Sequence, residues 1–420
     1  MKYNPPIYNA LEEYAENTVS RFHMPGHGGR AQDGFLGDVY RYDVTELSET
    51  DDLACPTGVI AEAQRLAAEK FGAESTLFSC QGATLCIRAA IYACLMLRPR
   101  GRIYCHRKVH KSVVNTFVLL DIRPVWFCDE DTDFSDCDAV IYTHTDYHGN
   151  IFPCEKLYSA AQKYGFLVVA DNAHGSHLAF MEGGRLHPVR MGADFCIDSL
   201  HKTLAVLTGG ACLNVKKAEW SPLCRSGMTL FGSTSPSYLI MASIDKALSL
   251  VSGDVLDKTR RAVEAVKKRH PSFFADGSGE CDPLRMTLRC ENPRELYTLL
   301  YEKGIKCEFY DACGVVLIPP YGADESCFAP LEEVLYGYDS GHYDASYDIK
   351  YKIPPRACAI RKAAFSPSHE VDIICAEGKV SAGEYSLYPP GVPLIVPGEI
   401  FTKEIINCLE DSFDKVKILD

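Results

Sequence analysis

The sequence has no apolar run of the length that a membrane-spanning helix needs, and Met1–Asn17 has no apolar stretch of the signal-peptide kind. It also has no excess of basic residues, because 43 Lys and Arg stand against 56 Asp and Glu and the formal net charge is −13. Binding to a polyphosphate requires a basic face, so nucleic acid is excluded as a partner. These absences predict a cytoplasmic protein that neither crosses a membrane nor binds nucleic acid.

The cysteines lack the spacing of a metal or disulfide framework, although there are 19 of them. No two form a Cys-x-x-Cys pair, and the closest spacings are Cys80/Cys86 and Cys307/Cys313. Most lie in apolar stretches, where a reduced thiol behaves as a small hydrophobic side chain. The sequence therefore predicts no metal site, and it favours a reducing compartment.

Short apolar segments alternate with helical patterns over the first 255 residues of this 420-residue chain. The strand candidates are 75–80, 101–105, 123–128, 139–144, 166–171, 193–198 and 210–215. Such alternation predicts an α/β fold, a mostly parallel sheet with helices on both faces. The alternation weakens from about residue 256, which predicts a smaller α+β C-terminal domain with a long connection at 320–356. The predicted domains are an N-terminal arm (1–40), a large domain (41–255) and a small domain (256–420).

Three polar residues follow predicted strands and point to one kind of site. Thr84 ends the turn CQGAT (80–84), after which a helix begins, and a helix N-terminus favours a phosphate. Asp171 ends the apolar strand of VVADNAHG (168–175), where a carboxylate needs a cation or donors. Lys202 lies beside Ser199 and His201, and a shielded lysine near cationic groups forms a Schiff base with an aldehyde.

Each of these residues alone has a simpler interpretation, as a helix N-cap (Thr84), an Asx-turn (Asp171) or a solvated lysine (Lys202). Ligands of parallel sheets collect at the carboxyl ends of the strands, where all three residues are predicted to lie. A phosphate site, a buried aspartate and a strand-end lysine in this order together predict a pocket for pyridoxal 5'-phosphate.

The chain also resembles the bacterial ornithine/lysine/arginine decarboxylase family of fold-type-I pyridoxal phosphate enzymes. The stretches that carry the resemblance are FHMPGHGG (22–29), DVTELSETDDLACPTGVIAEAQRLAAEKFGA (43–73), VHKSV (109–113), DNAHGSH (171–177), DSLHKTL (198–204), STSPSYLIMASID (233–245) and YPPGVPLIVPGE (388–399). It is most similar to the short forms without the N-terminal receiver-like wing domain. The resemblance implies that the large domain binds the cofactor and that a homodimer shares its active sites.

The resemblance also implies roles for individual residues. Lys202 forms the Schiff base, Asp171 pairs with the pyridinium nitrogen, and Ala173 and His110 lie against the two faces of the ring. His201, or a residue of the other subunit, is the expected general acid. The remaining expected cofactor contacts, mostly to the phosphate, are Ala83, Thr84, His174, Ser199, His201 and, from the neighbouring subunit, Ser233 or Thr234. Simpler interpretations stay open: a helix-terminal surface histidine for His110, a core histidine for His174 and a helix cap for the stretch around Ser233.

The implied reaction is decarboxylation of a basic amino acid, arginine or lysine ahead of ornithine, to an amine of polyamine biosynthesis. Two alternatives remain, another reaction of the same cofactor, such as transamination or aldol cleavage, and a non-catalytic regulatory relative. The sequence departs from the family at Gln81–Thr84, at THTDYHG (143–149), where the family tends to have Thr-Ser-Pro-x-Tyr-Tyr-Gly, and at Gly383, where it commonly has glutamate. Acids expected to face a basic substrate are Glu46, Asp51, Asp52, Glu384 and Glu399.

Overall fold

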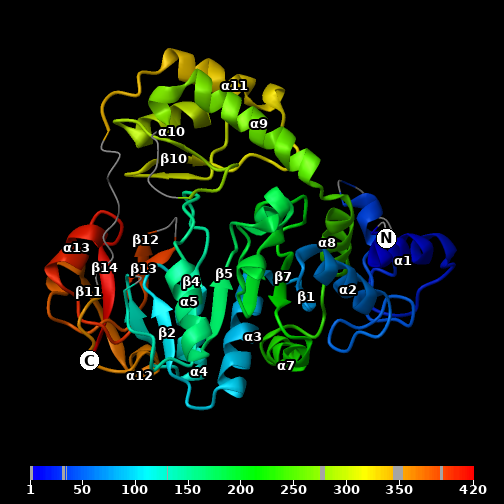
Figure 1. Cartoon of the computed structure of the whole chain (residues 1–420), viewed down its shortest axis with the longest axis horizontal. Helices are drawn as coiled ribbons and strands as arrows, with labels where there is room; N and C mark the ends of the chain where they lie inside the picture. The colour runs from blue at the N-terminus through cyan, green and yellow to red at the C-terminus, as the bar shows by residue number, and fades with distance from the viewer. Residues whose placement is uncertain are drawn as a thin grey trace. The chain divides into compact units, whose positions relative to one another are not determined.

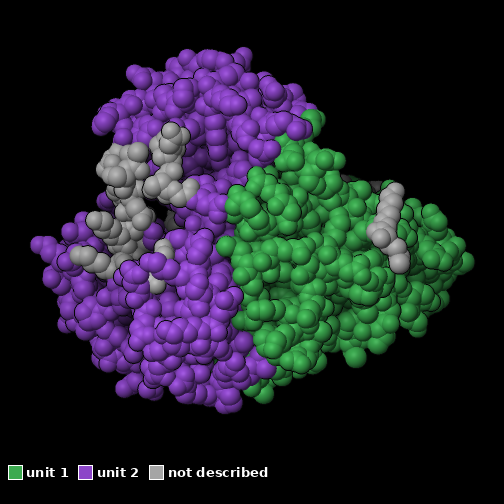
Figure 2. Space-filling view, in the orientation of Figure 1, with its two compact units in different colours: residues 1–96, 172–258, 320–322 green, residues 97–171, 259–319, 323–420 purple. Residues whose placement is uncertain are grey.

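A computed structural model describes residues 3–30, 34, 36–129, 131–274, 280–343, 353–387 and 391–420 (Figure 1). The chain forms two compact units, each assembled from separate segments (Figure 2). Unit 1 comprises residues 1–96, 172–258 and 320–322, and unit 2 comprises 97–171, 259–319 and 323–420. The division into units does not test the domain boundaries expected at residues 40 and 255, so these boundaries stay a prediction. None of the described helices is long and apolar enough to cross a membrane.

Unit 1 contains three adjacent strands in the order β1-β7-β6, and β7 runs antiparallel to both neighbours. The strands are β1 (Ser75–Ser79), β6 (Phe195–Asp198) and β7 (Ala211–Val215). The α-helices that lie in this unit, apart from the last residue of α3, are α1 (Pro6–Asn17), α2 (Val59–Phe71), α3 (Gly82–Leu97), α6 (Pro188–Met191), α7 (Ser221–Phe231) and α8 (Tyr238–Leu250). All residues of β6 and β7 are buried, which explains why their sequences are mostly apolar, with Asp198 and Asn214 as the polar exceptions.

Unit 2 contains four parallel strands in the order β5-β4-β2-β3. They are β2 (Ile103–His106), β3 (Val125–Phe127), β4 (Ala139–Thr143) and β5 (Leu167–Asp171), and the helices between them are α4 (Lys111–Leu120) and α5 (Glu155–Tyr164). The seven strands predicted from the sequence are thus confirmed, each within a few residues of its expected bounds. The parallel order of these four confirms the α/β class.

The rest of unit 2 holds three small antiparallel sheets with their own apolar cores. One sheet consists of β8 (Met286–Leu288), β10 (Gly314–Leu317) and β9 (Phe309–Asp311). The helices near it in the sequence are α9 (Gly253–Arg269), α10 (Pro293–Glu302) and α11 (Glu325–Gly337), and α9 begins in unit 1. The C-terminal elements are α12 (Ile360–Phe365), β11 (Ser368–Asp372), β12 (Tyr385–Leu387), β13 (Val392–Ile395), α13 (Lys403–Leu409) and β14 (Lys415–Leu419).

The expectation of a long connection at 320–356 is wrong for its first half, because α11 occupies 13 residues of it. The helix begins after Asp324, whose carboxylate accepts the N–H of Ser326, and it buries Phe328, Leu331 and Leu335 on one face. Pro330 lies inside the helix, and this residue together with the surrounding turn formers hid the helical spacing. Residues 344–352 of the same stretch lie outside the described residues.

Candidate active site

Lys202 lies where the sequence predicts it, on a short 3₁₀ turn (Leu200–Lys202) that follows β6 directly. Its Nζ atom is 2.9 Å from Nε2 of His174, a buried histidine that follows β5. When Lys202 is an ammonium it can only donate a hydrogen bond, and Nε2 of His174 is then the acceptor. The structure therefore places a proton acceptor against the lysine that the sequence predicts to be the nucleophile.

His201 is held by the turn at Gly209 and Gly210. Its Nδ1 is 3.1 Å from the carbonyl oxygen of Gly210, to which its backbone N–H also donates. Burial lowers the pKa of His201, and the nearby charge of Lys202 lowers it further, although the hydrogen bond to Gly210 acts in the opposite direction. His201 is thus neutral at neutral pH, with its proton on Nδ1, so that Nε2 carries the lone pair. Ser199 is buried, and its Oγ lies 3.4 Å from Nδ1 of His201.

The same glycine turn contacts the N-terminus of α3, where the sequence predicts the phosphate. The N–H of Gly82 donates to the carbonyl oxygen of Gly209 over 2.7 Å, so Ala83 and Thr84 in the first turn of α3 lie near the segment that bears Ser199 and His201. Gly209 has a φ of +98°, and a Cβ there would lie 3.0 Å from the carbonyl oxygen of Cys80. Glycine is therefore required at this close approach.

The residues brought together in unit 1 fit pyridoxal phosphate. The first N–H groups of a helix have no partner within that helix, and a phosphate accepts such donors. A Cβ built on Gly82 would meet nothing within 4 Å, so there is room in front of the helix terminus. Beside Lys202, the hydroxyl of Thr203 is buried and has no hydrogen-bond partner within the described part of the chain, as expected of a group that faces a ligand. Helix N–H groups, hydroxyls, a neutral histidine and a lysine make up the donor set that this cofactor needs.

Two further predicted residues, Asp171 and His110, belong to unit 2. Asp171 is the last residue of β5 and is buried, and its backbone carbonyl accepts the N–H of His144. His110 is the N-cap of α4, where its Nδ1 accepts the N–H of Ser112 over 3.2 Å. The location of His110 at a helix terminus thus agrees with the simpler interpretation as well as with the cofactor role, so both roles stay predictions.

Ser233 and Thr234 are exposed in the segment between α7 and α8. Ser233 Oγ accepts the N–H of Ser235, whereas the N-cap of α8 is Ser237. The helix-cap interpretation of this stretch therefore applies to Ser237, and the two hydroxyl residues expected to reach another subunit lie at the surface. Ala173 is half-buried in the turn before His174.

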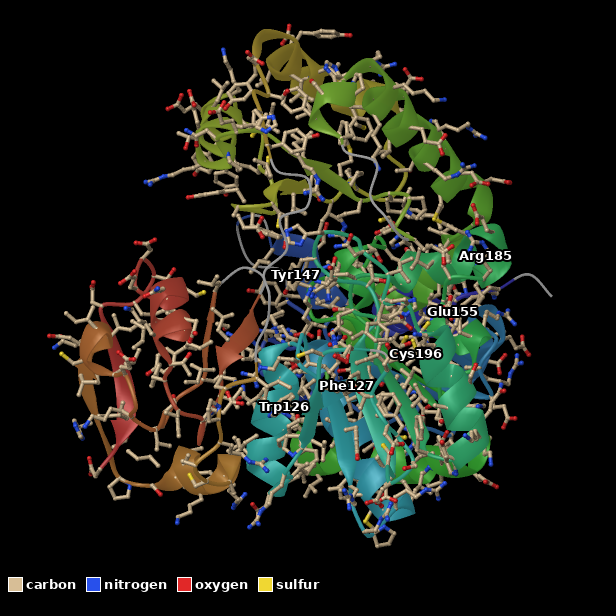
Figure 3. The ribbon with its side chains drawn as sticks, turned by 60° about the vertical axis from the view of Figure 1, so that its left-hand side comes forward. Trp126, Phe127, Tyr147, Glu155, Arg185 and Cys196 are labelled. Atoms are coloured by element: carbon tan, nitrogen blue, oxygen red, sulfur yellow. The ribbon has the colours of Figure 1, made fainter. Side chains whose placement is uncertain are left out.

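Asp198 is a site residue that the sequence analysis missed. It is fully buried and accepts hydrogen bonds from the amides of Asn172 and Asn214, both over 2.8 Å, and from Nε2 of His187 over 3.1 Å. Burial alone would raise the pKa of Asp198, but the neighbouring His187 and the hydrogen bonds bring it below its usual value. Cys196, which is labelled in Figure 3, lies on the same strand with Sγ 3.4 Å from this carboxylate. This network fixes the end of β6, and Ser199–Lys202 follow directly after it. The only signal of Asp198 in the sequence was an acid at the end of an apolar strand.

Two of the acids expected to face the substrate have other partners. Both oxygens of Glu399 are bound by Arg107 over 2.9 Å, and both side chains are 1% exposed. The carboxylate of Asp51 accepts backbone N–H groups at the start of α2, including those of Gly58 and Ile60. The expectation that Glu399 faces a substrate is therefore wrong, whereas the one for Asp51 stays a prediction. The expectations for Glu46, Asp52 and Glu384 also stay predictions, and the buried Oε1 of Glu384 has no partner within the described part of the chain.

Gly383, where the sequence departs from the family, lies close to the ring of Tyr385. A Cβ on Gly383 would lie 3.1 Å from the ring of Tyr385, so a larger residue would force that ring to move. Tyr385 packs on Phe401 and Phe413 in the C-terminal core and therefore has little freedom to do so. The first three residues of the motif 388–399 lie outside the described residues.

The fold and the site define the class of protein. A solved serine palmitoyltransferase of Sphingomonas wittichii shares the fold with a TM-score of 0.56 at 15% identity, over 80% of this chain and 83% of that chain. A solved lysine decarboxylase of Francisella novicida matches with a TM-score of 0.82 at 17% identity, over 100% of this chain and 81% of that one. The chain has the fold of type I pyridoxal phosphate enzymes.

The particular family follows from the sequence matches. Residues 5–137 and 128–271 match the major domain of the Orn/Lys/Arg decarboxylases, and residues 343–414 match their C-terminal domain. An arginine decarboxylase of Bacillus anthracis is 26% identical, over 98% of this chain and 94% of its own length. The chain belongs to the Orn/Lys/Arg decarboxylase family and is a lyase that depends on pyridoxal phosphate.

Proposed function

We propose that the protein decarboxylates arginine or lysine to agmatine or cadaverine. The observation that carries this proposal is the contact of Lys202 with His174, beside a helix N-terminus suited to a phosphate. Similarity to an arginine decarboxylase and to a lysine decarboxylase supports a basic substrate. When bound, pyridoxal phosphate supplies the electron sink that lets the carboxylate leave as CO2.

The side chains have separate tasks in this proposal. Lys202 supplies the amine that joins the cofactor, and His174 accepts a proton from it, so that the amine becomes nucleophilic. The first turn of α3, with Ala83 and Thr84, holds the phosphate together with Ser199 and His201. Nε2 of His201 carries a lone pair, so it would first bind a proton from solvent and then pass it to the substrate carbon that the carboxylate leaves.

Asp171 and His110 keep the roles that the family resemblance implies. The buried carboxylate of Asp171 would stabilise a proton on the ring nitrogen, and the imidazole of His110 would pack against the ring. Ala173 would lie against the opposite face. Ser233 or Thr234 would reach the phosphate of a second subunit, because both are exposed, and this requires a homodimer.

A reducing cytoplasm and a role in polyamine formation complete the proposal. None of the 19 cysteines, all of which lie in the described residues, is in a disulfide. Nine of them are buried, which raises the pKa of thiols such as Cys86, Cys105 and Cys212 and keeps them protonated. Thiols outside disulfides in this number suit a reducing compartment.

The test is release of CO2 from arginine, lysine, ornithine and one uncharged amino acid by the protein loaded with pyridoxal phosphate. We expect the highest kcat/KM for arginine or lysine and no release by Lys202→Ala. Glu384→Gln should raise the KM for the basic substrates more than for the uncharged one, if its buried carboxylate faces the side chain. Formation of keto acid without CO2 would support transamination instead. If Lys202→Ala still released CO2 or formed keto acid at the normal rate, the proposal would be contradicted.

A further inference from the structure

Three donor side chains of unit 2 that have no assigned role at the cofactor form a cluster. His148, Asp311 and Cys313 are half-buried, and one ligand atom of each lies within 4.8 Å of the others. Nε2 of His148 is 2.9 Å from Oδ2 of Asp311. His148 stands in THTDYHG (143–149), a stretch in which the sequence departs from the family pattern.

A tight hairpin places Asp311 and Cys313 side by side. Strands β9 and β10 pair Asp311 with Gly314, which leaves Ala312 and Cys313 as a two-residue turn. The N–H of Cys313 donates to Oδ1 of Asp311 over 2.8 Å, which fixes the carboxylate and leaves Oδ2 directed to His148. Gly314 has a φ of +139°, and a Cβ there would lie 2.4 Å from the carbonyl oxygen of Leu288. The turn is therefore held in one conformation by its neighbours.

The loop that carries His148 is anchored with equal firmness. The carbonyl oxygen of Gly149 accepts the N–H of Asp282 over 2.7 Å, and the carbonyl of Tyr147, labelled in Figure 3, accepts from Arg285. The ring of His148 packs edge-on against Phe309 of β9, with the centroids 5.6 Å apart. The imidazole thus already points at Asp311, and binding of an ion would require only small movements of three side chains.

We propose that His148, Asp311 and Cys313 bind a divalent transition-metal ion of the Zn²⁺ class. An imidazole nitrogen, a thiolate and a carboxylate are the ligand types that Zn²⁺ takes, and three protein ligands with water in the fourth position make a tetrahedral site. The two anionic ligands balance the charge of the ion, and the hydrogen bond from Cys313 N–H to Asp311 is the outer contact that orients a metal-binding carboxylate. The ion would join the loop after β4 to the β9–β10 hairpin.

A second cluster of the same composition makes a useful contrast. His187, Cys196 and Asp198 also lie within 4.8 Å of one another, but all three are fully enclosed. Both oxygens of Asp198 already accept hydrogen bonds from asparagine amides, as described above. An ion there would have to displace these donors in a closed core, whereas the residues of the cluster at His148 are only half-buried.

The experiment uses the full-length protein with its cofactor, first stripped of metal by EDTA. Zn²⁺ binding is measured by calorimetric titration, and Co²⁺ is used as a spectroscopic probe in the visible range beyond the cofactor absorption. Ligand variants are Cys313→Ser, His148→Gln and Asp311→Asn. Matched controls are Cys327→Ser, which removes an exposed thiol, and His369→Gln, which removes an exposed histidine paired with Asp420.

We expect one strongly bound Zn²⁺ per chain and tetrahedral Co²⁺ bands. Each ligand variant should lose at least about tenfold in Zn²⁺ affinity, since even a residue that only hydrogen-bonds to a metal ligand contributes that much. The controls should bind like the unmodified protein. Zn²⁺ should also protect Cys313, and not Cys327, from alkylation by iodoacetamide in peptide mapping. Equal binding by Cys313→Ser, or Co²⁺ spectra without tetrahedral bands in the unmodified protein, would overturn the proposal. If one variant does not fold, the alkylation of the unmodified protein still decides.

Discussion

Nζ of Lys202 and Nε2 of His174 lie 2.9 Å apart, although 28 residues separate them in the chain. The contact joins the turn after β6 to the turn after β5, and it pairs two groups that both carry exchangeable protons. An amine reacts with an aldehyde only when it is deprotonated, and Nε2 of His174 lies where it can accept the proton of Lys202.

His174→Gln should therefore slow the formation of the lysine–cofactor bond. We expect a loss of about 100-fold in the rate at which cofactor-depleted protein becomes yellow with pyridoxal phosphate, the lower end of what a positioned base contributes. The measurement is stopped-flow absorbance over a range of pH, with borohydride reduction and peptide mapping to locate the label on Lys202. His369→Gln serves as the control, and an unchanged rate and pH profile in His174→Gln would show that His174 is only a core residue.

The proposed shared active sites predict complementation between two inactive variants. Lys202→Ala protein is mixed with the Ser233→Ala/Thr234→Ala double variant after mild dissociation, and CO2 release is followed. A hybrid dimer would contain one intact site, so an equal mixture should recover about one quarter of the activity. A mixture of Lys202→Ala with a variant at the exposed Cys327 does not test the shared site. It serves as the control for the exchange of subunits between dimers. No recovery, despite hybrids detected by mass spectrometry, would contradict the role of Ser233 and Thr234.

Asp245 of α8 predicts an unusual pH dependence of stability. Its carboxylate accepts the N–H groups of Ile7 and Tyr8 at the start of α1 and the hydroxyl of Tyr3. Burial raises the pKa of Asp245 to about 6, although these hydrogen bonds act in the opposite direction. The folded protein therefore binds more protons than the unfolded chain between about pH 4 and pH 6, so this residue makes stability fall as the pH rises through that window.

Asp245→Asn should remove that loss and keep the hydrogen bonds, because an amide can accept from the backbone and donate to Tyr3. We expect the variant to gain a few kcal/mol relative to the unmodified protein between pH 4 and pH 7. Thermal unfolding at several pH values measures the gain, with Asp254→Asn at an exposed position as the control. A constant difference across that range would refute the prediction.

The buried pair of Arg107 and Glu399 predicts a strong asymmetry between single and double variants. Arg107 also donates to the carbonyl of Leu394 and lies 4.9 Å from the ring centroid of Trp126. Arg107→Met should cost about 3–5 kcal/mol, because it leaves a buried carboxylate without its partner. Arg107→Met/Glu399→Leu should recover much of this loss in denaturant unfolding. Breaking the exposed pair Arg65–Glu62 serves as the comparison and should cost far less.

The sequence predicted the elements whose signal is local. Lys202, Asp171 and Thr84 were found because strand ends are visible as apolar runs that stop at a polar residue. Glu399 was misassigned because its partner, Arg107, lies 292 residues away, and no local pattern reports such a pair. Asp198 was missed for a related reason, since its donors come from separate segments.

Helix α11 shows a different limit of the sequence analysis. Its apolar positions at 328, 331 and 335 have helical spacing, but Pro330 and the turn formers around them outweighed that spacing. Packing of these side chains into the core of β8–β10 determines the outcome, and that core is assembled from segments as far apart as Ala262 and Leu335.

The turn at Gly209 and Gly210 sets a constraint on how this protein can change its length. Two successive carbonyl groups of the turn hold two different segments, the start of α3 and His201, so the spacing between residues 201 and 210 is fixed from both sides. Insertion or deletion of one residue there would shift both acceptors together and disturb the phosphate end and the lysine end of the site at once. Loops elsewhere on the surface can vary in length, whereas a viable insertion in this turn would need compensating changes in two distant parts of the chain.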